Sequence, residues 1–106
     1  MDKKQSIKII KEFTKNLKED FNVNEIIFFG SRAIGKSRKD SDIDLIIVSD
    51  DFKNMSFIER GALMYNYWTY LIPVDFICLT IEEYNRLKKR ISIVKEALES
   101  GILISK

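Results

Sequence analysis

Two aspartates one residue apart are the first candidates for chemistry in this sequence. Asp42 and Asp44 precede an apolar run, Leu45 to Val48, that indicates a buried strand. On a strand, residues i and i+2 point to the same face, so the two carboxylates would lie side by side and repel each other. A divalent cation relieves this repulsion, and magnesium prefers such hard oxygen ligands. The pattern favours a magnesium site; the alternative is two solvated residues at an exposed strand start.

A third carboxylate, Asp75, follows Pro73-Val74 at the start of another apolar segment. An unpaired buried charge is costly, so this carboxylate must be exposed or paired. If its strand neighbours the strand of Asp42, three carboxylates converge, which is enough for one or two magnesium ions. The alternative is a surface aspartate at the edge of a sheet.

Gly30 and Ser31 follow residues 25–29, a β-branched and aromatic segment that predicts a buried strand. A glycine allows a sharp backbone turn and lets a phosphate approach the main chain. Ser31 would begin a short helix, where free N–H groups and the helix dipole favour an anion. Taken alone, the pair fits an ordinary strand-to-helix turn with a serine cap. Beside the three carboxylates, it predicts a site for phosphate.

The composition excludes several other classes of catalysis. The chain has 106 residues and no histidine, which rules out Ser-His and Cys-His nucleophiles and zinc sites with imidazole ligands. Its single cysteine, Cys78, permits no internal disulfide and stands in an apolar run, as a small core residue would. The net charge of +2 does not by itself indicate a nucleic-acid partner. The basic clusters at 32–39 and 86–90 have no interleaved aromatic residues and can be solvated surfaces.

Hydrophobic periodicity predicts the elements that must position these residues. We expect helices at 5–19, 31–35, 55–71, 81–90 and 92–100, a loop at 36–41, strands at 25–29, 42–49 and 74–79, and a possible short strand at 102–104. The fold class is therefore α/β: a small mixed sheet of three main strands with helices packed against it, in a single domain over residues 1–106. No segment approaches the roughly 20 apolar residues of a membrane helix, and no signal segment is evident, so we expect a cytoplasmic protein.

The predicted helix at 55–71 carries more aromatic residues than one face can bury. One stripe, which we assign to the core, consists of Phe57, Met64, Tyr67 and Leu71. A second stripe consists of Tyr65, Trp68 and Ile72. This second stripe is either another core contact or a docking surface for a partner or a second copy of the chain.

The combined pattern resembles a known family. Gly-Ser-Arg-Ala beginning at Gly30, Ser-Asp-Ile-Asp-Leu ending at Leu45, and a later Asp75 are similar to the DNA polymerase beta-type nucleotidyltransferase superfamily. Within it, the chain is most similar to the minimal nucleotidyltransferases of archaea and bacteria, and the resemblance covers nearly the whole chain. The resemblance implies a nucleotidyltransferase-like fold.

The resemblance also implies roles for individual residues. It implies that Asp42, Asp44 and Asp75 bind magnesium, with two ions in all. It also implies that Gly30-Ser31 binds the phosphate oxygens of a nucleoside triphosphate such as ATP. Ile34 stands where the family often has a second arginine. The basic contact to the nucleotide would then come from Arg32, Lys36 or Arg38.

The implied reaction is attack by an acceptor hydroxyl on the α-phosphorus, with release of pyrophosphate and with Asp75 taking the proton. Minimal nucleotidyltransferases are often paired with a small helical toxin of the HEPN type. The implied acceptor is a tyrosine of such a toxin, and the implied role is that of an antitoxin. The sequence leaves open a homo-oligomer, a non-catalytic module that neutralises a partner by contact, and a nucleic-acid-binding module that uses the basic clusters.

Overall fold

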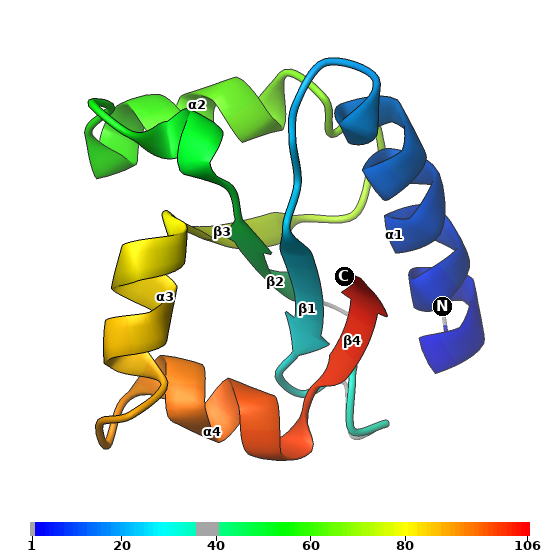
Figure 1. Cartoon of the computed structure of the whole chain (residues 1–106). Coiled ribbons are helices and arrows are strands. Elements are labelled where there is room, and N and C mark those ends of the chain that lie inside the picture. The colour runs from blue at the N-terminus through cyan, green and yellow to red at the C-terminus, as the bar shows by residue number, and fades with distance from the viewer. Residues whose placement is uncertain (1, 36–40) are drawn as a thin grey trace.

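The structure is a computed structural model that describes residues 2–35 and 41–106 (Figure 1). In chain order its elements are α1 (Lys3–Lys18), β1 (Glu25–Phe29), β2 (Ile43–Val48), the short 3-10 helix η1 (Asp50–Phe52), α2 (Phe57–Tyr65), β3 (Val74–Leu79), α3 (Ile81–Leu87), α4 (Ile93–Ser100) and β4 (Ile102–Ser105). The strands form one sheet in the order β3-β2-β1-β4. β1 is antiparallel to β2 and β4, whereas β2 and β3 are parallel. The predicted α/β class is confirmed, and the short fourth strand is present.

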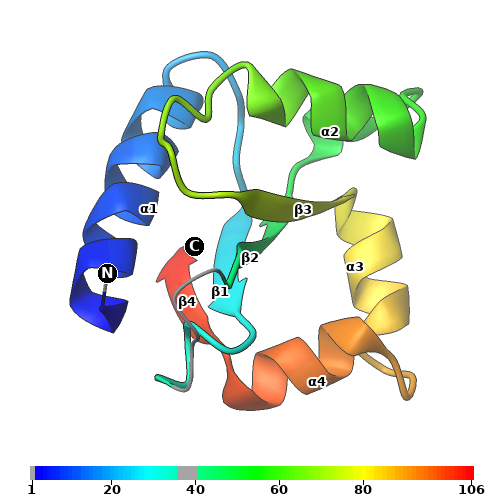
Figure 2. The ribbon, with the colours of Figure 1, turned by 180° about the vertical axis from the view of Figure 1, so that it is seen from behind.

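Helices cover both faces of the central strands, which explains why β1 and β2 are apolar along most of their length. On one face, residues of α1 pack against the sheet in a cluster that includes Ile10, Phe13, Leu17, Ile26, Phe28, Leu45 and Ile47. On the other face, α3 and α4 contribute to a cluster that includes Tyr84, Val94, Ala97, Ile27, Ile46, Val48 and Leu79. Both views show α3 and α4 next to each other and away from α1 (Figures 1 and 2).

Side chains at the N-termini fix where three of the helices begin. Reciprocal capping boxes are formed by Asp2 with Gln5, Ser56 with Glu59, and Thr80 with Glu83. Each box satisfies backbone N–H groups that have no partner within the helix. The cap predicted at Thr80 is confirmed. No helix within the described ranges is both long and apolar enough to cross a membrane.

The helix predicted at 55–71 is too long. α2 ends at Tyr65, and residues 66–73 run through turns and bends into β3. Trp68 packs edge-on against Phe13, with ring centroids 5.2 Å apart, and its Nε1 donates to the Ile72 carbonyl oxygen at 2.7 Å. These tertiary contacts draw the chain away from the helix axis, and they outweigh helix propensity.

The early end of α2 also changes the predicted core stripe. Met64 is buried as expected, but Phe57 is 68% exposed and Leu71 is fully exposed. The helix predicted at 81–90 is likewise shorter, because α3 ends at Leu87. The loop predicted at 36–41 lies outside the described residues except for Ser41, which has no regular structure.

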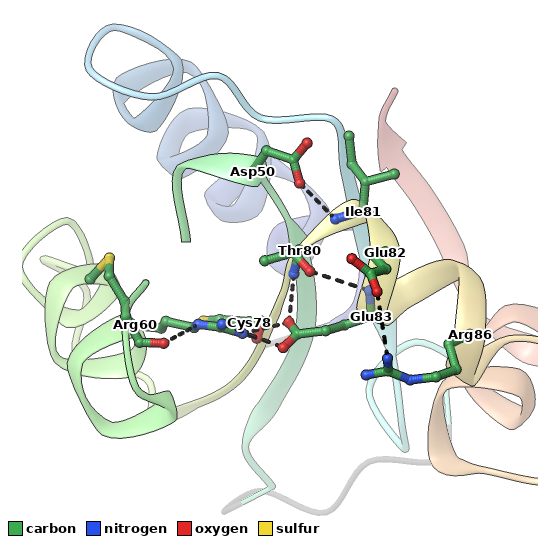
Figure 3. A network of polar contacts seen from close by, with 9 residues as sticks. Asp50, Arg60, Cys78, Thr80, Ile81, Glu82, Glu83 and Arg86 are labelled. Atoms are coloured by element: carbon green, nitrogen blue, oxygen red, sulfur yellow. Dashed lines mark hydrogen bonds and ion pairs between the residues drawn. The ribbon is translucent and has the colours of Figure 1, made fainter. Parts of the chain in front are cut away.

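A buried ion pair connects α2 to α3 and to the end of β3 (Figure 3). Arg60 Nη1 lies 2.6 Å from Glu83 Oε1 and donates to the Cys78 carbonyl oxygen at 3.1 Å. Burial acts to raise the pKa of Glu83, but hydrogen bonds from Arg60 and Thr80 and the Arg60 charge outweigh it, so the pKa lies below its ordinary value. Cys78 is a buried core residue, as predicted, and burial raises the pKa of its thiol to about 12.

Candidate active site

Gly30 directly follows β1, and a side chain at this position would displace the predicted ligand Asp44. Its φ is +83°, in the left-handed region that favours glycine. A Cβ atom at this position would lie 2.2 Å from Asp44 Oδ2. The turn that follows is closed by the amides of Ala33 and Ile34, which donate to the Gly30 carbonyl oxygen at 3.1 and 3.3 Å. The predicted short helix at 31–35 is therefore only a series of hydrogen-bonded turns, and Ser31 is half-buried within it.

The strand register brings the three predicted carboxylates together. Asp44 is directly opposite Asp75 in the parallel pairing of β2 with β3, so both side chains lie on one face. Asp42 immediately precedes β2, and its side chain is close enough to form a hydrogen bond with that of Asp75. The Ile43 amide donates to the Pro73 carbonyl oxygen at 2.9 Å, which fixes the two strand starts relative to each other.

The clustering of negative charge raises the pKa values of Asp44 and Asp75. The pKa of Asp44 is raised to about 6, first by burial and then by the charges of Asp75 and Asp42. The pKa of Asp75 is raised by burial, by the charge of Asp42 and by a side-chain hydrogen bond with Asp42. Such shifts mark a concentration of negative charge that a cation would relieve.

The chemistry of the three carboxylates suits magnesium. None of the ion pairs formed between described residues includes Asp42, Asp44 or Asp75. Across residues 2–35 and 41–106, no three acidic, cysteine or histidine side chains are arranged to hold a metal ion. The three side chains supply hard oxygen ligands and negative charge, which are the properties that magnesium requires.

Of the three basic residues predicted to contact the nucleotide, the structure describes Arg32. Arg32 is 5% exposed, and its Nε donates to the Ser41 carbonyl oxygen at 2.6 Å. Arg32 therefore braces the segment that leads into Asp42, and its contact with a nucleotide stays a prediction. Lys36 and Arg38 lie outside the described residues.

A cavity of about 310 Å³ adjoins the turn at Gly30 and Ser31. The rest of its lining comes from Phe29 and Ile34 beside the turn and, from α4, Ile93, Glu96, Ala97 and Ser100. Ile34, which lines this cavity, is 49% exposed. The turn is therefore accessible to a ligand from the side on which α4 lies.

Sequence reasoning did not identify Tyr65 as a residue of this site. Its hydroxyl donates to the Val74 carbonyl oxygen at 2.5 Å, one residue before Asp75. Burial raises the pKa of Tyr65, and the charges of Asp75 and Asp42 raise it further. No spacing in the sequence signals this placement, because it depends on where α2 ends and how the chain turns back into β3.

Comparison with known proteins identifies the family of this chain. The family model for the nucleotidyltransferase domain matches residues 10–104. A protein of Methanocaldococcus jannaschii, "Putative protein adenylyltransferase MJ0604", is 47% identical over 97 residues, which span 89% of this chain and 92% of that protein. "Probable protein adenylyltransferase MntA" of Haemophilus influenzae is 28% identical over 104 residues, which span 94% of this chain and 87% of that protein.

Solved structures share the fold. The crystal structure of a "putative nucleotidyltransferase" from Sulfolobus solfataricus is similar with a TM-score of 0.69 and 27% identity, over 95% of this chain and 80% of that one. A toxin–antitoxin crystal structure with AMP-PNP is similar with a TM-score of 0.64 and 19% identity, over 90% of this chain and 72% of that one. The predicted enzyme class is confirmed by the family and relative matches. The chain belongs to the nucleotidyltransferase domain family.

Proposed function

We propose that the protein is a magnesium-dependent adenylyltransferase that moves AMP from ATP to a hydroxyl group of another protein. The observation that carries this proposal is the placement of Asp42, Asp44 and Asp75 on one sheet face beside the Gly30 turn. The two curated relatives, both designated as protein adenylyltransferases, support the choice of AMP and of a protein acceptor.

Each part of the site has a role in this reaction. Asp42 and Asp44, with Asp75, would hold two magnesium ions, which when bound neutralise the triphosphate and make the acceptor hydroxyl more acidic. The backbone at Gly30-Ser31 lies open to the phosphates, and the Ser31 hydroxyl can donate to a phosphate oxygen. Arg32 or Lys36 would add a basic contact.

The chemical step is a single displacement in which Asp75 accepts the acceptor's proton. The acceptor oxygen forms a bond to the α-phosphorus, the bond from that phosphorus to the bridging oxygen breaks, and pyrophosphate leaves. Asp75 is suited to this role because its carboxylate lies at the exposed start of β3, beside Asp44 on the neighbouring strand.

For the acceptor we propose a tyrosine of a small helical toxin of the HEPN type, with the protein acting as its antitoxin. The solved toxin–antitoxin with AMP-PNP has the same fold, and a tyrosine hydroxyl is a suitable nucleophile for this displacement. ATP is available in the cytoplasm, where we expect the protein to act. Pairing with a second copy of the chain is compatible with this role.

The acceptor is tested by incubating the protein with ATP, magnesium and a purified helical toxin partner, followed by peptide mass spectrometry. The expected result is AMP on a tyrosine of the partner with the wild-type protein and none with Asp44→Asn. If Asp44→Asn inhibits the toxin as well as the wild type does, and no AMP is attached, the protein is a binding module rather than an enzyme.

A further inference from the structure

Tyr65, the last residue of α2, contacts both residues that flank Asp75 in the sequence. Its hydroxyl donates to the Val74 carbonyl oxygen at 2.5 Å. Its ring packs edge-on against Phe76, with ring centroids 4.9 Å apart. The tyrosine therefore contacts the backbone before Asp75 and the side chain after it, and Asp75 is the carboxylate to which the proposed function assigns the acceptor's proton.

The start of β3 depends on support of this kind. Among the four strands that the structure describes, β3 is at the edge of the sheet and pairs only with β2. The outer backbone groups of an edge strand have no strand partner. Pro73, immediately before β3, has no N–H group to donate. The hydrogen bond from Tyr65 gives the Val74 carbonyl oxygen a partner. The next residue, Asp75, is exposed.

The position of Tyr65 is poorly explained by a role in the core alone. It is 50% exposed, whereas Phe13 and Phe28 are completely buried. Its hydroxyl lies within the electrostatic field of the site, because the charges of Asp75 and Asp42 raise its pKa after the effect of burial. The phenol therefore stays protonated at neutral pH and remains a hydrogen-bond donor.

We propose that Tyr65 is a positioning residue for nucleotidyl transfer, which fixes the start of β3 so that the Asp75 carboxylate stays beside Asp42 and Asp44. The inference rests on the proposed function, because it assigns Tyr65 a part in the same reaction. Tyr65 acts through Asp75, whereas the phosphate-binding turn at Gly30-Ser31 does not depend on it.

The test compares Tyr65→Phe with Tyr67→Phe. Each variant removes one hydroxyl and keeps the ring, and the Tyr67 hydroxyl makes a similar bond, 2.6 Å to Asp20 Oδ2, away from β3. For Tyr65→Phe we expect kcat for transfer to fall about tenfold with KM for ATP unchanged, since one hydrogen bond that aligns the reacting groups is lost. The control should change neither constant.

Amide hydrogen exchange measured by NMR provides a readout that does not depend on activity. In the free protein, the Asp75 amide should exchange faster in Tyr65→Phe than in the wild type, and at the wild-type rate in Tyr67→Phe. Equal effects of the two variants on kcat, or unchanged exchange in Tyr65→Phe, would overturn the proposal. AMP found on Tyr65 itself would also overturn it, because Tyr65 would then be an acceptor.

The two proposals fail in different ways. If the wild-type protein transfers no nucleotide, the proposed function is wrong, and the exchange comparison still decides whether Tyr65 holds the start of β3. If the wild type is active and Tyr65→Phe is equally active, only the positioning role is wrong.

Discussion

Gly30 packs directly against the Asp44 carboxylate at the end of β1. This close contact limits which residues can replace either one. A methyl group at Gly30 would meet Asp44 Oδ2, the movable end of a side chain. The fold can adjust by rotating the carboxylate, but the site then loses a ligand in its required position. A substitution here should therefore damage activity far more than stability.

Gly30→Ala tests this expectation against Gly35→Ala. Both glycines have positive φ, +83° and +78°, so each substitution should cost about 1–2 kcal/mol of backbone strain. A Cβ atom at Gly35 would have no atom of the described residues within 4 Å. We expect transfer to fall at least about 100-fold in Gly30→Ala, since a ligand of the metal site is displaced, and only slightly in Gly35→Ala. Similar activity of the two variants, measured by steady-state assay, would contradict the Asp44 contact.

Asp44→Asn tests the metal site without relying on catalysis. Removal of one charge from a cluster of three should leave the melting temperature in metal-free buffer unchanged or higher, because repulsion is relieved. Magnesium should raise the melting temperature of the wild type, since a ligand that binds only the native state stabilises it. A magnesium-induced rise of the same size in Asp44→Asn would show that the ion binds elsewhere.

For single residues, type and spacing were enough to predict that Asp44, Asp75 and Gly30 would lie close together, whereas their roles stay predictions. Asp42 and Asp44 share a face by strand periodicity alone, and Asp75 was expected at the start of another strand. Tyr65 could not be found in this way, because the bond from its hydroxyl to Val74 spans a turn whose path is set by tertiary packing.

At the scale of the elements, the packing of α2 against β3 and α3 depends on Arg60. Arg60→Met would leave Glu83 half-buried without its partner, and we expect a loss of roughly 3 kcal/mol in the free energy of unfolding, as is typical of a broken buried pair. Arg86→Met is the control, because its pair with Glu82 is exposed and 3.9 Å long, and it should cost less than about 1 kcal/mol. Equal losses in urea denaturation would contradict the structural role of Arg60.

The same pair predicts how stability depends on pH. The folded-state pKa of Glu83 is lowered, so its contribution is fully present above the ordinary glutamate pKa and is lost as pH falls through the folded-state value. The wild type should therefore lose more stability than Arg60→Met as acid is added below that ordinary pKa. Denaturation curves over this pH range measure the difference, and parallel losses in the two proteins would show that Glu83 is not coupled to Arg60.

Trp68→Ala tests the corrected path of the chain after α2. Trp68 contacts Phe13 and Tyr70 by edge-on ring packing, and its indole N–H is satisfied by Ile72. We expect the variant to lose about 3 kcal/mol of unfolding free energy, as large-to-small changes in packed regions do. Leu71→Ala, at a fully exposed neighbour, should have almost no effect. A stable Trp68→Ala that fails to bind a partner would instead restore the docking role.

The lengths of elements were harder to predict than their types. Periodicity identified every main strand and the capping box at Thr80, because these signals are local. The end of α2 at Tyr65 was missed, since aromatic residues at 67–70 continue a helical pattern. In the structure Trp68 instead packs against Phe13 of α1 and Phe76 of β3.

For the molecule as a whole, the sheet order explains why the site lies where it does. β2 runs parallel to β3 and antiparallel to β1. The starts of β2 and β3 therefore lie next to the end of β1. The face that carries the carboxylates is covered by α3 and α4 over Ile46, Val48 and Leu79, beyond the strand starts. The mixed sheet was predicted from element order, but the parallel pairing was not, because strand direction is decided by long-range packing.

Transfer of label from ATP tests the central claim most directly. The wild-type protein, magnesium and a purified helical toxin partner would be incubated with ATP labelled either at the α-phosphorus or at the γ-phosphorus, with Asp44→Asn in parallel. We predict that label from the α-position becomes attached to the partner, that label from the γ-position leaves with pyrophosphate, and that Asp44→Asn transfers neither. Attachment of the γ-label, or equal α-labelling by Asp44→Asn, would contradict nucleotidyl transfer at this site.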